Sequence, residues 1–243
     1  MLRDTLIPLT LTKVAQPETP KAPRLRPMLA ISRSPLAAVG VVVAALSGAS
    51  FRMTGPIFGQ QVGLEITAIA YFLASFVLGG AIAQYPIGFI ADKIDRRWVL
   101  IWLSFAAIIS CIVTANITTI DIYTLMITAG FFGFTTFPIF SVAAAHAHDF
   151  AKDYERVELS AALMFFYAVG AIAAPYTASV LMESFGPSAL FYLIAFGHAA
   201  LVIFGFYRML SRPSVEEKTD YIYSPRTSFL IGRLLKSHHK DNK

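Results

Sequence analysis

Residues 64–97 read LEITAIAYFLASFVLGGAIAQYPIGFIADKIDRR. No charged residue stands between Glu65 and Asp92, whereas five of the six positions from Asp92 to Arg97 are charged. A helix needs about 20 apolar residues to cross the hydrocarbon core of a bilayer. An uncharged stretch of at least that length, closed by a dense group of charges, predicts a helix that crosses a membrane and ends at its surface.

The composition extends this interpretation to the whole chain of 243 residues. Hydrophobic residues make up 56% of it and charged residues only 14%, which is too little charge for the wet surface of a soluble protein. Apolar runs of membrane length predict an all-α integral membrane six-helix bundle. The expected spans are Leu36–Pro56, Leu64–Ala91, Trp98–Ala115, Thr119–Ala144, Val157–Met182 and Pro187–Met209.

The basic residues lie almost entirely on one side of these spans. Arg208, the two ends of the chain and the loops 92–97 and 145–156 hold nineteen of the twenty Lys and Arg residues, and Arg52 is the twentieth. The loops that would lie on the other side hold none. Because basic loops stay inside, we expect a multi-pass protein of the cell (inner) membrane with both termini cytoplasmic. The basic residues lie between and beyond the spans, which argues against a nucleic-acid partner despite the net charge of +5.

Three regions follow from this pattern. Residues 1–35 are expected to form a cytoplasmic linker-like segment with little helix, since residues 13–35 are rich in proline and basic residues. Residues 36–210 form the transmembrane bundle, and residues 211–243 form a basic cytoplasmic tail. A short apolar segment, Leu6–Leu11, cannot span a membrane; it is either the remnant of an earlier helix or an interfacial segment.

Neither a metal site nor a cofactor is predicted. Cys111 is the only cysteine, so no disulfide within the chain or cysteine-based metal site is available. His146 and His148 are two positions apart, and this spacing points them to different faces of a helix.

The charged loop after the second span carries the most informative motif. Gly88, Asp92, Lys93, Arg96 and Arg97 match the order Gly-x-x-x-Asp-(Arg/Lys)-x-Gly-(Arg/Lys)-(Arg/Lys), except that Asp95 stands at the second glycine. A plain loop held inside by its basic residues is the simpler interpretation. The order, however, resembles the signature loop of the major facilitator superfamily, in which a weaker copy occurs in the second half.

Other segments extend the resemblance. Gly170–Pro175 is similar to the fifth helix of a family half, although Ala174 replaces a frequent glycine, and Phe185-Gly186-Pro187 resembles the turn before the last helix. The proline-rich residues 13–35 resemble the linker between halves. The chain thus resembles the C-terminal six-helix half of a twelve-helix fold in an uncharacterised bacterial member. This implies transport of a small solute by alternating access, with the motif as a gating loop.

Polar and aromatic residues in the spans are candidates for the substrate pathway. For Arg52, snorkelling to the outer surface is the alternative, and for Gln84 it is a helix-to-helix hydrogen bond. His198 is a proton-relay candidate for H⁺ coupling or a histidine bonded to a neighbouring helix. Aromatic packing explains Tyr71, Tyr167 and Tyr176 as well as substrate stacking does. Small surfaces for close helix contact are offered in the second span by Gly79, Gly80, Ala83 and Gly88, and in the fourth by Gly130 and Gly133.

We expect a secondary transporter driven by an ion or substrate gradient rather than by a nucleotide, because no Gly-x-x-x-x-Gly-Lys-(Ser/Thr) motif is present. An intramembrane enzyme is disfavoured by the lack of a Gly-x-Ser-x-Gly motif and of paired intramembrane aspartates. A single half raises three alternatives: a truncated product, a half that pairs with a second six-helix half, or a homodimer. A non-transporting remnant or scaffold subunit is the competing function. The sequence identifies neither the small-molecule substrate nor the coupling ion nor the direction of transport.

Overall fold

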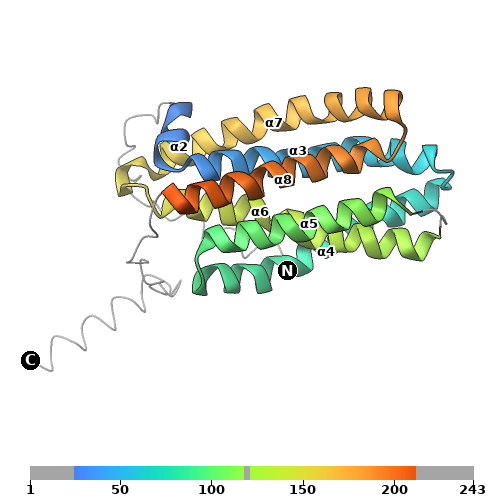
Figure 1. The fold of residues 1–243 in the computed structure, drawn as a ribbon, viewed down its shortest axis with the longest axis horizontal. Helices are drawn as coiled ribbons and strands as arrows, with labels where there is room; N and C mark the ends of the chain where they lie inside the picture. Colours follow the sequence, from blue (N-terminus) through green and yellow to red (C-terminus); the bar gives the residue numbers. More distant parts are fainter. Residues whose placement is uncertain (1–24, 118–120, 212–243) are drawn as a thin grey trace, which may run out of the picture.

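The computed structural model describes residues 25–117 and 121–211 (Figure 1). Six of its helices are long and apolar enough to cross a membrane, which confirms the six predicted spans, and no strand occurs in the described residues. The expected linker before residue 25 and the expected tail after Ser211 lie outside the described part. The elements are α2 (Pro27–Arg33), α3 (Pro35–Gln61), α4 (Ile66–Lys93), α5 (Arg96–Ala115), α6 (Ile122–His148), the 3₁₀ turn η1 (Asp153–Glu155), α7 (Arg156–Phe185) and α8 (Ala189–Ser211).

Prolines explain two differences from the expected boundaries. Pro56, where we expected the first span to end, lies inside α3, which continues to Gln61; a membrane helix tolerates proline when neighbouring groups satisfy the freed backbone. The proline-rich segment before α3 was expected to contain little helix, yet Pro27 begins α2. Proline suits the first position of a helix because its φ is already helical and its missing N–H would have no partner there.

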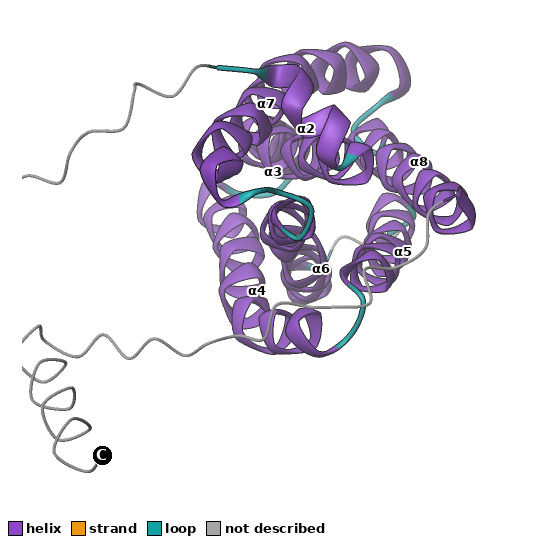
Figure 2. Cartoon of the chain, turned by 90° about the vertical axis from the view of Figure 1, so that its left-hand side faces the viewer, coloured by secondary structure: helices purple, strands orange, loops and turns teal. Residues whose placement is uncertain are grey.

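Four of the spans pack around two central helices, α3 and α6. α4 packs mainly on α6, and α7 packs mainly on α3, while α5 lies against both α6 and α8. Figure 2 shows that α4 and α7 border the same flank of the bundle and that α5 and α8 form the other flank. We call the first of these the α4/α7 flank.

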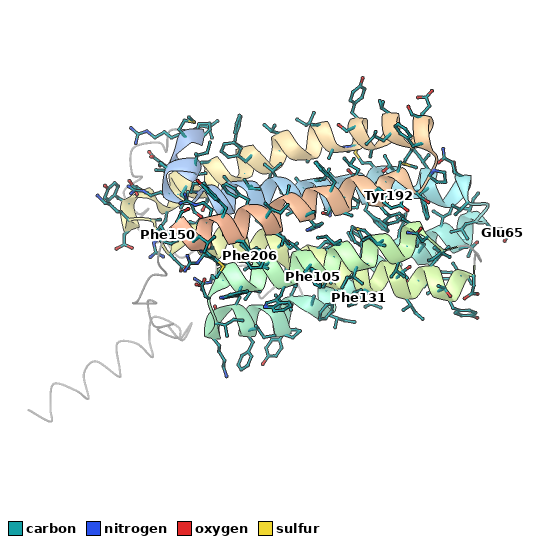
Figure 3. The ribbon with its side chains drawn as sticks, viewed as in Figure 1. Glu65, Phe105, Phe131, Phe150, Tyr192 and Phe206 are labelled. Atoms are coloured by element: carbon teal, nitrogen blue, oxygen red, sulfur yellow. The ribbon has the colours of Figure 1, made fainter. Side chains whose placement is uncertain are left out.

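The two ends of the bundle differ in charge. One end carries α2, the turn between α4 and α5, and the segment 149–156, and we call it the charged end. Figure 3 shows Phe150 at this end and Glu65 at the opposite end. At the opposite end, α7 stops at Gly186, whose φ of 86° is a conformation that favours glycine. The predicted turn before the last helix is therefore confirmed.

Glycines allow α4 and α6 to pack backbone against backbone. A Cβ added at Gly79 would overlap the carbonyl of Gly130, and one added at Gly133 would overlap the carbonyl of Phe76. Lipid provides no hydrophobic force between helices, so close packing of this kind holds them together. The expected small contact surfaces are confirmed at these three glycines, whereas Gly88 faces open space.

Aromatic side chains fill the core between the glycine contact and the opposite end. Phe51 of α3 lies 4.3 Å from Phe76 and 5.1 Å from Phe72 of α4, measured between ring centroids. Phe132 of α6 and Phe191 of α8 complete the cluster. All five side chains are buried, so this cluster joins four helices in the opposite half of the bundle.

We predict that Gly133→Ala lowers the thermal unfolding midpoint of the protein in detergent. The new methyl group would collide with backbone rather than with a movable side chain, and such overpacking costs about 1–3 kcal/mol. Gly88→Ala is the matched control, because a Cβ at Gly88 meets nothing within 4 Å and alanine favours the helix. Equal midpoints for the two variants would contradict the proposed close contact.

Candidate functional site

The charged turn between α4 and α5 is built around Asp95. Its side chain accepts a hydrogen bond from the backbone N–H of Arg97 at the start of α5. The guanidinium of Arg97 donates to the same carboxylate at 2.8 and 3.0 Å. Aspartate is a preferred residue at the start of a helix because it satisfies an unpaired backbone N–H. The residue that departs from the family motif therefore has a structural role here.

Hydrogen bonds with Arg97 also set the charge state of this turn. Burial by itself would raise the pKa of Asp95, but the hydrogen bonds and the positive charge of Arg97 outweigh it. The pKa of the Asp95 carboxyl therefore lies below its ordinary value of 3.8. Asp95 remains ionised throughout the neutral range as a result.

Arg96 links three helices at the charged end. It pairs with Asp149 at the end of α6 and, at 3.3 Å, with Asp92 one turn back in α4. Lys93 lies over the ring of Phe89, 4.0 Å from its centroid. Asp92 and Gly88 remain exposed. Arg96 and Arg97 thus fasten the turn, whereas Gly88 and Asp92 are exposed on α4.

Two further ion pairs link α2 and the residue before it to η1 and the start of α7. Arg33 lies 2.6 Å from Glu155, and Arg26 lies 3.4 Å from Glu158. The charged end is therefore cross-linked electrostatically within this one bundle. These acidic partners were not candidates in the sequence, because their pairing depends on how the helices cross.

A cavity at mid-depth brings two of the pathway candidates together. The guanidinium of Arg52 donates to the hydroxyl of Tyr167 at 3.1 Å. It turns back along α3 towards Gly48, where an added Cβ would lie 3.2 Å from Arg52 Nη2. Gly48 is the central residue of Pro35–Gln61. Arg52 therefore does not snorkel to the nearer end, as the alternative for this residue supposed.

The walls of this cavity come from α3, α6 and α7. They are formed by Ala44, Gly48, Arg52, Thr136, Phe137, Phe140 and Tyr167. The ring of Phe140 meets Tyr167 edge to face, with centroids 5.3 Å apart. Gly48 could have been found in the sequence, since it lies one turn before Arg52, but nothing in the sequence indicates the residues from α6.

The other pathway candidates do not line this cavity. Tyr71 and Tyr176 are 56% and 75% exposed, and Gln84 is also exposed. These residues belong to α4 and α7, the two helices that border the α4/α7 flank. They remain pathway candidates only as exposed groups on these two helices.

His198 is fully buried between α8 and α3. Its Nε2 lies 2.8 Å from the hydroxyl of Ser47, which donates its own proton to the carbonyl of Val43. Nε2 must therefore carry the proton and donate it to Ser47. Nδ1 is buried without a hydrogen-bond partner among the described residues. This geometry favours a link between helices over a proton relay.

The two histidines of α6 point to different surroundings. His146 is buried and packs edge to face on Phe150. His148 lies within hydrogen-bond distance of Ser160 in α7, with Nε2 at 3.1 Å from the hydroxyl. No group of three potential metal ligands occurs in the described residues.

We predict that Asp95→Asn changes how stability depends on pH. The folded pKa of Asp95 is depressed, so the ionised carboxylate stabilises the fold above the ordinary pKa of 3.8 and this contribution disappears as the pH falls further. Asparagine keeps the helix cap but loses the charge. The wild type should therefore have a higher unfolding midpoint at neutral pH, and the gap should begin to narrow below about pH 4 and close as the pH falls through the lower pKa of the folded state. A gap independent of pH would contradict the assignment.

Comparison with known proteins agrees with this architecture. The sequence profile of the Major Facilitator Superfamily matches residues 37–239. An uncharacterized MFS-type transporter of Enterobacter sp. (strain 638) is 27% identical over 226 residues, which cover 92% of this chain and 56% of that protein.

Two relatives named uncharacterized MFS-type transporter YcaD are similar over a shorter range. The protein of Salmonella heidelberg (strain SL476) is 27% identical over 80% of this chain and 50% of its own length. That of Escherichia coli O17:K52:H18 is 29% identical over 78% of this chain and 49% of its own length. The chain thus spans about half the length of these relatives. With the profile match and the six spans, these findings show that the chain is a multi-pass membrane protein that belongs to the Major Facilitator Superfamily.

Proposed function

We propose that this chain is one half of a gradient-driven transporter of a small solute. A second six-helix bundle, packed against the α4/α7 flank, would complete the transport pathway. The charged end would face the cytoplasm of a bacterial inner membrane, in agreement with the positive-inside rule. Rocking of the two bundles about the cavity of Arg52 would expose it to each side in turn.

The observation that carries this proposal is the pairing of a polar cavity with an unburied flank. In their most apolar stretches, α4 and α7 are 33% and 28% buried, whereas the other four spans are 44–67% buried. The cavity of Arg52 and Tyr167 lies beside α7. An arginine in contact with lipid at this depth costs several kcal/mol. A second bundle over the flank would remove that cost.

The exposed side chains of this flank suit a contact between proteins as well as one with lipid. On α4 they include Tyr85, and on α7 they include Ile172 and Tyr176. Gly88 adds a position at which another helix could approach closely. In the proposed cycle, the contact near Gly88 and Asp92 breaks and reforms as the bundles rock.

The second bundle could be a separate six-helix half or a second copy of this chain. We favour a separate half, because the relatives are about twice as long as this chain and share its sequence over only one part of their length. A non-transporting scaffold subunit is the second candidate function. In neither case do we propose an enzymatic activity or a cofactor.

Transport can be tested without knowledge of the substrate. Right-side-out membrane vesicles from cells that produce the protein are energised, and their accumulated solutes are compared by mass spectrometry. We expect Gly88→Trp to abolish the solute difference between producing and non-producing membranes, because its bulk would separate the two bundles. Ile203→Trp is the matched control on α8, where Ile203 is 70% exposed. Identical solute profiles for wild-type and empty membranes would favour the scaffold function.

A photo-crosslinking experiment tests the second bundle itself. We predict that p-benzoylphenylalanine at Tyr85 or Ile172, which are 84% and 79% exposed, captures a protein partner in native membranes. The same probe at Ile203 should capture only lipid. A product of twice the chain mass would identify a second copy, and any other partner identified by mass spectrometry would indicate a separate half. Capture at Ile203 but at neither other position would refute the arrangement.

A further inference from the structure

We infer that the cavity of Arg52 binds a small organic monoanion, with its carboxylate held between Arg52 and Tyr167. The inference rests on the proposed function, since it names the class of solute that the cavity would accept. It follows from four properties of the cavity: its charge, its hydrogen-bonding groups, its depth and its walls.

The charge of the cavity is a single uncompensated cation. All six ion pairs of the described residues lie at the charged end, and none includes Arg52. No aspartate or glutamate lines the cavity. A guanidinium stays charged in proteins, so this site requires an anion from elsewhere. One cation matches one negative charge on the ligand.

Arg52 and Tyr167 offer hydrogen-bond donors to the cavity. Tyr167 accepts a hydrogen bond from Arg52, which leaves its own proton without an acceptor among the described residues. The hydroxyl of Thr136 is already directed at the carbonyl of Phe132, at 2.8 Å. Arg52 and Tyr167 can therefore each donate to one oxygen of a carboxylate, and arginine is particularly suited to that planar group.

The depth of the cavity strengthens this interaction. The guanidinium lies beside the central residue of α3, and Thr136 lies next to the midpoint of α6 (Ile122–His148). Away from bulk water, a charge-assisted hydrogen bond is worth more than it is at a protein surface. The absence of a side chain at Gly48 makes room for the guanidinium to reach this depth.

The remaining walls are apolar and aromatic. Phe137 and Phe140 of α6 and Ala44 of α3 line this cavity, which has a volume of about 60 Å³. A carboxylate joined to a compact aromatic or aliphatic body therefore fits better than phosphate or sulfate, which would leave these walls without a contact.

Ligand-induced thermal stabilisation tests this inference. The full chain is purified together with any captured second bundle and reconstituted in nanodiscs of Escherichia coli lipid. The probes are benzoate and phenylacetate, and each is paired with its uncharged amide, benzamide or phenylacetamide. We expect at least one acid to raise the unfolding midpoint in a concentration-dependent way, and neither amide to do so.

Variants assign the effect to the site. Arg52→Gln should weaken acid binding by at least roughly tenfold, and Tyr167→Phe by roughly three- to tenfold, because each loses a donor to the carboxylate. Arg52→Lys should lie between wild type and Arg52→Gln, since it keeps the charge and loses the planar fork. Arg156→Gln is the matched control, because it removes a surface arginine at the charged end whose one ion-pair partner among the described residues is Asp153.

Three results would overturn the inference: no shift with either acid, equal shifts with acid and amide, or an acid shift that survives in Arg52→Gln. In the first case, a loss of basal stability in Arg52→Gln would indicate that an acidic side chain of the second bundle neutralises Arg52 instead. Binding without any transport would refute the proposed function and leave this inference intact. Transport of an uncharged solute that Arg52→Gln does not alter would support the proposed function and refute this inference.

Discussion

The contact between the backbones of α4 and α6 is the constraint on which the bundle depends. Hydrophobic burial cannot hold helices together in lipid, so they must approach closely enough for backbone atoms to touch. Gly79 and Gly133 permit this at one crossing, and Gly170 permits a similar approach of α7 to Val42 and Ala45 of α3. Both central helices thus carry one closely attached outer helix, and these two outer helices border the same flank.

Charged groups are divided between two environments with different consequences. At the charged end, ion pairs such as Arg33–Glu155 join elements of this chain to one another. Exposed pairs contribute little stability individually, but together they orient α2, α5 and α7. Arg52 lies in the cavity at mid-depth, where it forms no ion pair with a carboxylate of the described residues. The charges at the charged end are therefore paired within the bundle, whereas the charge of Arg52 in its centre is not.

The sequence predicted the spans well and the site only in part. Span positions follow from length and charge, which is why the group from Asp92 to Arg97 marks the end of α4 to within a few residues. Pro56 misled the prediction because neighbouring helices decide whether a proline ends a membrane helix. Arg52 could be identified as a cation within a span, but its rotamer and its neighbour Tyr167 depend on how α3 and α7 cross. The contributions of Thr136 and Phe137 required the three-dimensional structure.

The backward turn of Arg52 has an electrical consequence. A full charge that crosses a membrane under 100 mV exchanges about 2.3 kcal/mol with the field. The guanidinium lies beside the middle of α3, so any tilt of the bundle that changes its depth moves charge through part of that voltage. A bound monoanion would cancel this movement. Membrane voltage would then act on the bundle without ligand and leave the bundle with bound ligand almost unaffected. The step in which the empty transporter returns would therefore respond to the resting potential, whereas the step that carries the solute would not.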